Sequence, residues 1–372
     1  MQFSQIPGLT ELKEQLIGAF KKGKVAHAQL FSGVSGTATF PIALAYASYL
    51  MCPNRTDKDS CGTCPNCTRI QKSIHPDVHW YFPKISASDS GKYEKVLGEA
   101  LPAWRTFISE SPYGTFEDWV GSYGQENKNL QLSREDSRQI LKNVSMRSVE
   151  GGYKVIFIWG IEFMHPTAAN AILKVLEEPP EKTIYLMVTF SYDLLLQTIT
   201  SRSQLINVPP NQVSEVQEYL IQKGVAEQQA KQLAKISQGR LGVGLHLVES
   251  EDEMAYQQFR DWMLACWNRD LTSLVSVSED FSKSGKANQR GFLTYSMSLI
   301  RNSLLKFAGS APPIINQEED TFVGKYAQKL GFEKLQTMYE LLNEALRHLD
   351  RNSNPRITHL NLSLAIVKRI NS

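Results

Sequence analysis

Four of the five cysteines lie close together near the start of the chain, with the spacing of a metal site. Four thiolates suit the tetrahedral coordination that Zn²⁺ prefers, and the two short Cys-x2-Cys intervals let a tight loop wrap one ion. Gly62, Pro65 and Asn66 supply the residue types that the turns of such a loop require. Because four thiolates leave no open coordination position, the pattern predicts a structural zinc site. The predicted ligands are Cys52, Cys61, Cys64 and Cys67.

An iron–sulfur cluster would also accept four cysteine ligands, but nothing in the surrounding sequence indicates redox chemistry. Clustered cysteines suit metal binding in a reducing compartment better than disulfides. The fifth cysteine, Cys266, lies in an apolar helical pattern with Trp262 and Trp267, so we expect an ordinary core thiol there.

A second candidate site is a glycine-containing turn between an apolar strand pattern and an apolar helix pattern. A working phosphate-binding loop reads Gly-x4-Gly-Lys-Ser/Thr: backbone N–H groups and the lysine hold the phosphates, and the hydroxyl holds magnesium. Gly33 and Gly36 are present. Ala38, Thr39 and Phe40 stand where the pattern has its second glycine, its lysine and its Ser/Thr. Without that cation and metal ligand the triphosphate charge stays largely uncompensated, so we expect no functional ATP site.

The elements that must position these sites follow from residues 153–210. An apolar strand pattern at residues 155–158 is followed by a helix with apolar residues on one face, and the prolines Pro179 and Pro180 stop that helix. A second apolar strand follows at residues 184–188. Strand, helix, strand is the repeating unit of a parallel sheet with helical crossovers.

Three stretches of this sequence resemble a known family. Residues 170–180 read NAILKVLEEPP and are followed by Ser201-Arg202-Ser203, which closely resembles the LLKxLEEPP and SRC motifs of clamp-loader ATPase-like subunits. Residues 27–33, HAQLFSG, resemble the entry to the first strand of those subunits. Bacterial clamp-loader subunits also carry a four-cysteine insertion after the first helix. The similarity covers nearly the whole chain outside residues 84–133.

The resemblance implies a multi-domain chain. Its parts would be an α/β P-loop (AAA+-like) parallel-sheet domain with a zinc-binding insertion, a small helical lid domain and an all-α collar domain. Two or three domains also suit a length of 372 residues. We expect the first domain at residues 1–209, with the zinc module at about 52–67 and a further insertion at about 84–133. The lid is expected at 210–249 and the collar, or oligomerisation domain, at 250–372.

The same resemblance identifies further losses in the nucleotide site. In the family an apolar strand ends in Asp-Glu to bind magnesium and orient water. Here the strand ends in Trp159-Gly160, and Glu162 comes two positions late. Active relatives place a nucleotide-sensing arginine where this chain has Gly242, although Arg240 is close by. We therefore expect a subunit that does not hydrolyse ATP.

Arg202 is the positive feature that remains. In clamp loaders the arginine of the SRC motif acts in trans as an arginine finger at the ATP of the adjacent subunit, where it offsets transition-state charge. The alternative is an arginine that pairs with a surface carboxylate. The resemblance thus implies a non-hydrolysing, delta-prime-type subunit of the DNA polymerase III clamp loader, which uses ATP to load a sliding clamp onto primed DNA. Its partners would be tau/gamma-type motor and delta-type subunits, the sliding clamp and primer–template DNA.

Two other functions fit the sequence less well. An ATP-hydrolysing tau/gamma-type motor subunit is disfavoured by Thr39, Phe40 and Trp159. A stand-alone zinc-containing DNA-binding protein needs clustered basic residues, whereas 40 Lys and Arg against 38 Asp and Glu give a net charge of only +2. Residues 1–7 have no secretory signal pattern, and the longest apolar run, residues 40–52, is too short to span a bilayer. We expect a cytoplasmic protein without a membrane partner.

The remaining patterns concern structure. His27, His75 and Asp77 are interpreted as strand-entry and turn residues. In the insertion, Ser- and Gly-rich stretches at 86–91 and 121–128 suggest loops. Its aromatic residues argue against disorder and would serve a partner surface or extra packing. These are Trp104, Phe107, Tyr113, Phe116 and Trp119. Four long helices are expected in the collar, at about 252–268, 287–308, 320–348 and 356–371.

Overall fold

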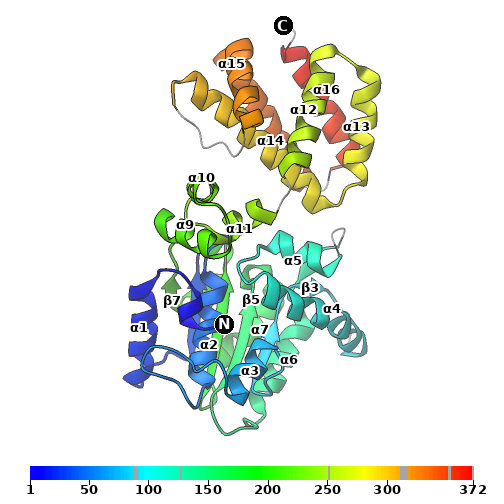
Figure 1. Cartoon of the computed structure of the whole chain (residues 1–372). Helices are drawn as coiled ribbons and strands as arrows, with labels where there is room; N and C mark the ends of the chain where they lie inside the picture. Colours follow the sequence, from blue (N-terminus) through cyan, green and yellow to red (C-terminus); the bar gives the residue numbers. More distant parts are fainter. Residues whose placement is uncertain (88–89, 126–127, 250–251, 311–316, 351–352, 371–372) are drawn as a thin grey trace. The chain divides into compact units, whose positions relative to one another are not determined.

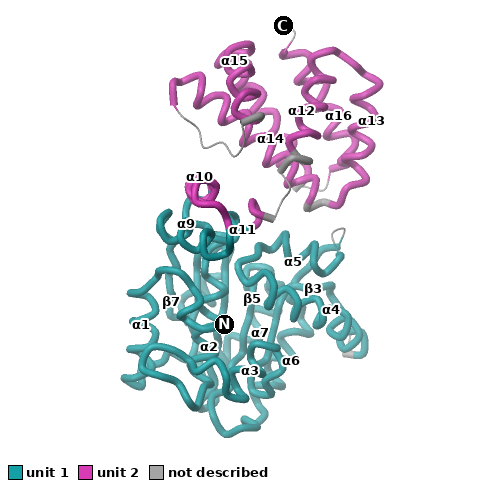
Figure 2. Tube along the Cα trace, viewed as in Figure 1, with its two compact units in different colours: residues 1–224, 237–245 teal, residues 225–236, 246–372 magenta. Residues whose placement is uncertain are grey.

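The computed structural model describes residues 1–87, 90–125, 128–249, 252–310, 317–350 and 353–370 (Figure 1). The chain divides into two compact units (Figure 2). The first consists of Met1–Gly224 with Ser237–Leu245, and the second of Val225–Ile236 with His246–Ser372. The predicted limits of the three domains stay predictions.

The first unit is built on a parallel sheet of five strands in the order β2-β5-β6-β1-β7. Every neighbouring pair in this sheet is parallel, so the connections cross over, and helices make most of those crossings. β5 and β6 are buried along their whole length, as expected for strands covered on both faces. The strands are β1 Ala28–Ser32, β2 Val78–Tyr81, β5 Lys154–Trp159, β6 Thr183–Thr189 and β7 Gln204–Asn207.

Helices follow each strand pattern that the sequence indicated. The predicted helix after the glycine turn is α2, and the predicted helix of the NAILKVLEEPP motif is α7. The helices of this unit outside the insertion are η1 Phe3–Gln5, α1 Thr10–Lys21, α2 Thr39–Met51, α3 Pro65–Gln71, α6 Arg134–Ser145, η2 Ile161–Phe163, α7 Pro166–Glu177, η3 Tyr192–Leu194, α8 Gln197–Thr200 and α9 Val213–Gln222; α11 Leu241–Glu249 begins in it.

Alternation along β5 decides what each face of the sheet packs against. Ile156 and Ile158 belong to a buried cluster with Ile140 of α6 and Ile172 of α7. Phe157 and Trp159 point to the other face, where both rings contact Phe40 in the first turn of α2. The second face therefore carries the region of the candidate nucleotide site.

The insertion is more regular than the sequence suggested. It contains α4 Ser90–Glu110, α5 Phe116–Tyr123 and a small antiparallel sheet of β3 Lys84–Ile85 with β4 Leu130–Gln131. The loops predicted at 86–91 and 121–128 are partly wrong, because α4 begins at Ser90 and α5 extends to Tyr123; residues 88–89 and 126–127 of those loops lie outside the described residues. Burial of aromatic side chains stabilises these helices despite their Ser and Gly content: Trp104 and Trp119 are fully buried. Extra packing is thus one role of the insertion.

The second unit is helical throughout its described residues. Four long helices are predicted in the collar region, and the described part of that region contains five. The additional helix, α13, begins where Asp270 caps it by accepting a hydrogen bond from the Ser273 N–H at 3.1 Å. Its many serines hid its helical pattern, which is carried by buried Leu274, Ser278 and Phe281. The helices are α10 Glu227–Ser237, α12 Asp252–Asn268, α13 Leu271–Lys283, α14 Lys286–Phe307, α15 Gln317–Asp350 and α16 Pro355–Ile370.

The helix α15 is interrupted at Gly331, whose φ of 71° and ψ of 175° are not helical. Glycine adopts this conformation without a steric penalty, so the chain bends there. Over the described part of the chain, no helix combines the length and apolar character needed to cross a membrane.

Candidate functional site

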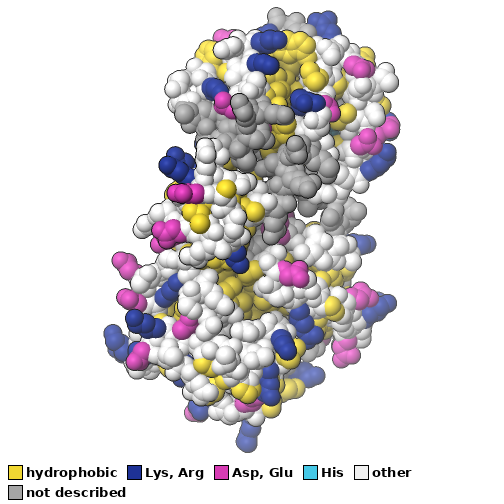
Figure 3. All heavy atoms as spheres, in the orientation of Figure 1, with side chains coloured by type: hydrophobic (Ala, Val, Ile, Leu, Met, Phe, Trp, Pro, Cys, Tyr) yellow, Lys and Arg dark blue, Asp and Glu magenta, His cyan; other side chains and the backbone are white. Residues whose placement is uncertain are grey.

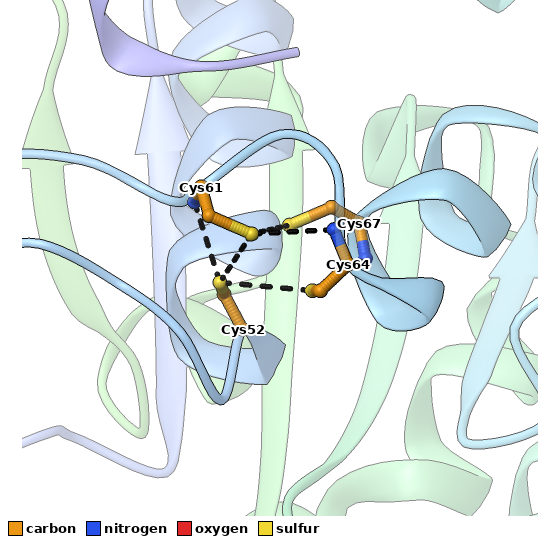
Figure 4. A group of neighbouring side chains, drawn as sticks. All are labelled: Cys52, Cys61, Cys64 and Cys67. Atoms are coloured by element: carbon orange, nitrogen blue, oxygen red, sulfur yellow. Dashed lines mark hydrogen bonds between the residues drawn. The ribbon is translucent and has the colours of Figure 1, made fainter.

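The structure brings the four clustered cysteines together, as predicted (Figure 4). Cys52 directly follows α2, Cys61 lies in the next loop, Cys64 caps α3 and Cys67 lies within it. All four sulfur atoms lie within 4.8 Å of one another. Neighbouring Sγ atoms are 3.5 Å apart for Cys52 and Cys61, and 3.8 Å for Cys52 and Cys64. Tetrahedral zinc with Zn–S bonds of about 2.3 Å needs sulfur–sulfur separations of about 3.8 Å, so the donor set fits Zn²⁺.

The electrostatics of the cluster also suit a cation. Backbone N–H groups of Thr63 and Cys64 lower the pKa of the Cys61 thiol to about 6. Burial raises the pKa of Cys52 and of Cys67. A raised pKa favours the neutral thiol, and a bound divalent metal would favour the thiolate that coordinates it.

The cysteine loop also holds the N-terminal segment. The Asp59 carboxylate accepts hydrogen bonds from the Phe3 N–H at 3.0 Å and the Ser4 N–H at 2.8 Å. The Gln2 side-chain amide donates to the Ser60 carbonyl at 2.6 Å. A metal in this loop would therefore order residues beyond its own ligands, which is the behaviour of a structural site.

The glycine turn after β1 is closed upon itself. The Thr37 and Thr39 hydroxyls are buried and lie 2.7 Å apart, within hydrogen-bond distance. The Gly36 carbonyl accepts a hydrogen bond from the Gly242 N–H at 2.8 Å. Gly242 approaches so closely that a Cβ there would collide with the Tyr113 carbonyl. Both hydroxyls and the Gly36 carbonyl of this turn thus have partners within the chain.

Aromatic rings fill the space beside this turn. Phe40, where the pattern has its magnesium-binding hydroxyl, is 1% exposed. Its ring centroid lies 5.9 Å from Trp104 of the insertion and 6.3 Å from Trp159 at the end of β5. Trp104 and Phe107 lie 5.3 Å and 5.6 Å from Trp159. Nucleotides bind outside the carboxyl ends of such strands, and here that region holds a packed aromatic cluster of Phe40, Trp104, Phe107 and Trp159.

Glu162 does not take the place of the missing acidic pair. Its carboxylate accepts a hydrogen bond from the Phe190 N–H, just after β6, at 2.9 Å. Burial raises its pKa. The group therefore holds the end of β6 in place. Arg240, which lies two positions before the expected nucleotide-sensing arginine, donates a hydrogen bond from Nε to the Ser237 carbonyl at 3.3 Å.

Arg202 follows α8 and carries a side chain that is 33% exposed. Its guanidinium is ion-paired with Glu177, the last residue of α7. Nη1 donates to the Thr198 carbonyl at 3.0 Å and to the Ser201 hydroxyl at 3.3 Å. The carboxylate pairing weighed as the alternative thus exists within this chain. Sequence reasoning missed Glu177, although it belongs to the motif that carried the resemblance.

The side chains of His27, Asp77 and Cys266 have structural roles. The His27 ring lies 2.9 Å from the Leu176 carbonyl. Asp77 accepts hydrogen bonds from the Val149 and Glu150 N–H groups at 2.7 Å and 2.9 Å. Cys266 is fully buried, and burial raises its pKa to about 12.

The fold and the cysteine cluster together define a class of protein: a P-loop-type (AAA+-like) α/β unit with a metal-site insertion, followed by helices. The family model for "DNA polymerase III, delta subunit" matches residues 8–212. The chain belongs to this family.

Individual relatives agree with the assignment. The chain is 29% identical over 196 residues to DNA polymerase III subunit delta' of Yersinia pestis, covering 53% of this chain and 45% of that protein. It is 27% identical over 261 residues to subunit delta' of Haemophilus influenzae, covering 70% of this chain and 66% of that protein. The chain therefore spans about half to two thirds of the length of these relatives.

Two further similar proteins contribute less to the family assignment. Subunit tau/gamma of Haemophilus influenzae is 26% identical over 262 residues, covering 69% of this chain and 32% of that protein. Among solved structures, a gamma-subunit-related protein of Thermotoga maritima covers 96% of this chain and 99% of its own, with 17% identity and a TM-score of 0.38.

Proposed function

We propose that this chain is a delta-prime-type clamp-loader subunit that acts in the cytoplasm. It has no functional ATP site of its own, and it supplies Arg202 as an arginine finger to the ATP site of a neighbouring subunit. The single observation that carries the first half is the aromatic cluster beside the glycine turn. A triphosphate with magnesium needs a cation, a metal ligand and free N–H groups. Phe40 stands in place of the magnesium-binding hydroxyl, and Trp159 ends the strand that carries the acidic pair in the family; both rings are buried.

The proposed role of Arg202 is supported by the exposure of its side chain and by the resemblance to clamp-loader subunits. Its guanidinium is partly exposed at the end of a short helix, where a neighbouring subunit could present a phosphate. In the assembled complex the partners would be tau/gamma-type motor and delta-type subunits, the sliding clamp and primer–template DNA. Zinc at the four cysteines would supply fold stability and no chemistry.

Calorimetric titration of the isolated chain with ATP and magnesium tests the first half. We expect no heat of binding at concentrations up to the millimolar range, and no release of phosphate. A matched titration of a tau/gamma-type subunit checks that the assay detects binding. Saturable binding by the isolated chain would contradict the proposal.

The similarity to tau/gamma subunits favours one second candidate, an ATP-hydrolysing motor subunit. The same titration separates the two, because a motor subunit must bind ATP. A stand-alone DNA-binding protein is supported less, since basic and acidic side chains are both spread over the face in view in Figure 3. Salt-sensitive DNA binding by the isolated chain would revive it.

A further inference from the structure

Three groups of this chain form a socket around Arg202: the Glu177 carboxylate, the Thr198 carbonyl and the Ser201 hydroxyl. Glu177 is the last residue of α7, directly before Glu178 and the two prolines that end the helix. Thr198 lies in α8, which ends two residues before Arg202. The socket thus joins the ends of two helices.

The socket leaves part of the guanidinium available. Arginine has five N–H groups in a rigid plane. The Nε and Nη2 atoms both face Glu177 Oε1, and Nη1 donates to Thr198 and Ser201. Nη2 has two N–H groups and, among the residues that the structure describes, meets only one acceptor atom, so one N–H remains to meet a phosphate oxygen. Arg202 is held and still able to bind an external anion.

Three exposed leucines lie within eight residues of Arg202 in the sequence. Leu194, Leu196 and Leu205, from the same stretch of chain, are 72%, 38% and 50% exposed. A neighbouring subunit that covered the Arg202 region would exclude water from it, and charge interactions strengthen when water is excluded.

We propose that Glu177 is a positioning residue for Arg202, which sets the direction of the guanidinium so that it reaches the neighbour's ATP without a search among rotamers. This inference rests on the proposed function of Arg202. A free arginine side chain samples many rotamers, and a reacting group displaced by about 1 Å can lose roughly 100-fold in rate. The opposite effect, in which Glu177 competes with the phosphate for Arg202, predicts a faster enzyme when the carboxylate is removed.

The test is a double-mutant cycle on the reconstituted clamp loader, with the DNA-stimulated ATPase rate as the readout. The variants are Glu177→Ala, Arg202→Ala and both together, with Glu177→Gln as the conservative change. Glu178→Ala is the matched control, because Glu178 is the adjacent exposed carboxylate and no contact of its side chain is seen in the described structure. Incorporation into the complex and thermal unfolding are measured for each variant.

Glu177→Ala is expected to lower the turnover of the adjacent ATP site about 10-fold with little change in the KM for ATP there, and Glu177→Gln, which keeps an acceptor, to lower it less. The double variant should be no slower than Arg202→Ala, since Glu177 acts only through Arg202. A rate for Glu177→Ala equal to that of Glu178→Ala, or above it, would overturn the positioning role, as would an additive loss in the double variant. If Arg202→Ala itself retains the full rate, the proposed function of Arg202 fails, and this inference fails with it.

Discussion

Restoring the two missing groups of the phosphate loop should not restore ATP binding. In the variant Thr39→Lys with Phe40→Thr the loop regains its lysine and its magnesium-binding hydroxyl. The side chains at both positions are essentially inaccessible, with Thr39 0% and Phe40 1% exposed. Truncating a buried phenylalanine costs about 3–5 kcal/mol, and burying an unpaired ammonium adds several more. The rings of Trp104 and Phe107 would remain beside the loop.

The phenylalanine truncation alone, about 4 kcal/mol, shifts the midpoint of unfolding by roughly 10 °C in a unit of this size, and the buried ammonium adds to that shift. We therefore expect the double variant to melt at least about 10 °C lower in differential scanning calorimetry and to show no ATP binding in calorimetric titration. Val34→Lys is the matched control, since it adds the same charge to the same turn at a side chain that is 52% exposed. The control should keep the wild-type melting temperature. An unchanged melting temperature together with micromolar ATP binding in the double variant would refute the account of the aromatic cluster.

Further predictions concern the metal and pH. Removing bound zinc with a chelator should lower the melting temperature of the first unit and increase hydrogen exchange at residues 2–4, which the cysteine loop holds. The substitution Cys61→Ser should have the same two effects. Cys266→Ser should leave the metal content unchanged. Burial lowers the pKa of His359 to about 4 from an ordinary value of 6.5, so its neutral form belongs to the folded state. The unfolded state binds the extra proton between these values, and the second unit should lose about 3 kcal/mol of stability as pH falls from about 6.5 to 4. Hydrogen exchange along α16 at pH 7 and pH 5 measures this loss of stability. If the His359→Phe variant loses the same stability between these pH values, another group is responsible for the pH dependence.

Local patterns allowed much of the fold to be predicted. The cysteine spacing, the strand–helix–strand unit and the proline stop after residue 178 each depend on neighbours in sequence, and the structure has all three. Apolar periodicity likewise placed four of the long C-terminal helices. It missed α13 because its apolar positions are spaced by serine.

The parts of the site that could not be predicted depend on contacts between residues far apart in the chain. Phe40, Trp104 and Trp159 come together only when α2, the insertion and β5 pack on one face of the sheet. In the sequence these residues stand out only one by one: Phe40 and Trp159 occupy positions where the family motifs have other residues, and Trp104 is an aromatic residue of the insertion. The pairing of Glu177 with Arg202 depends in the same way on how α7 and α8 meet.

The ATPase rate of the reconstituted clamp loader with wild-type or Arg202→Ala chain tests the central claim most directly. The claim is that this chain supplies charge to a reaction that takes place in another subunit. Arginine fingers contribute roughly 10³- to 10⁵-fold at a single site, and motor sites that do not face this chain would keep their own activity. We predict the loss of the turnover belonging to the adjacent site, with complex assembly and the remaining sites unaffected. A full rate with Arg202→Ala, in a complex of normal composition, would contradict the account.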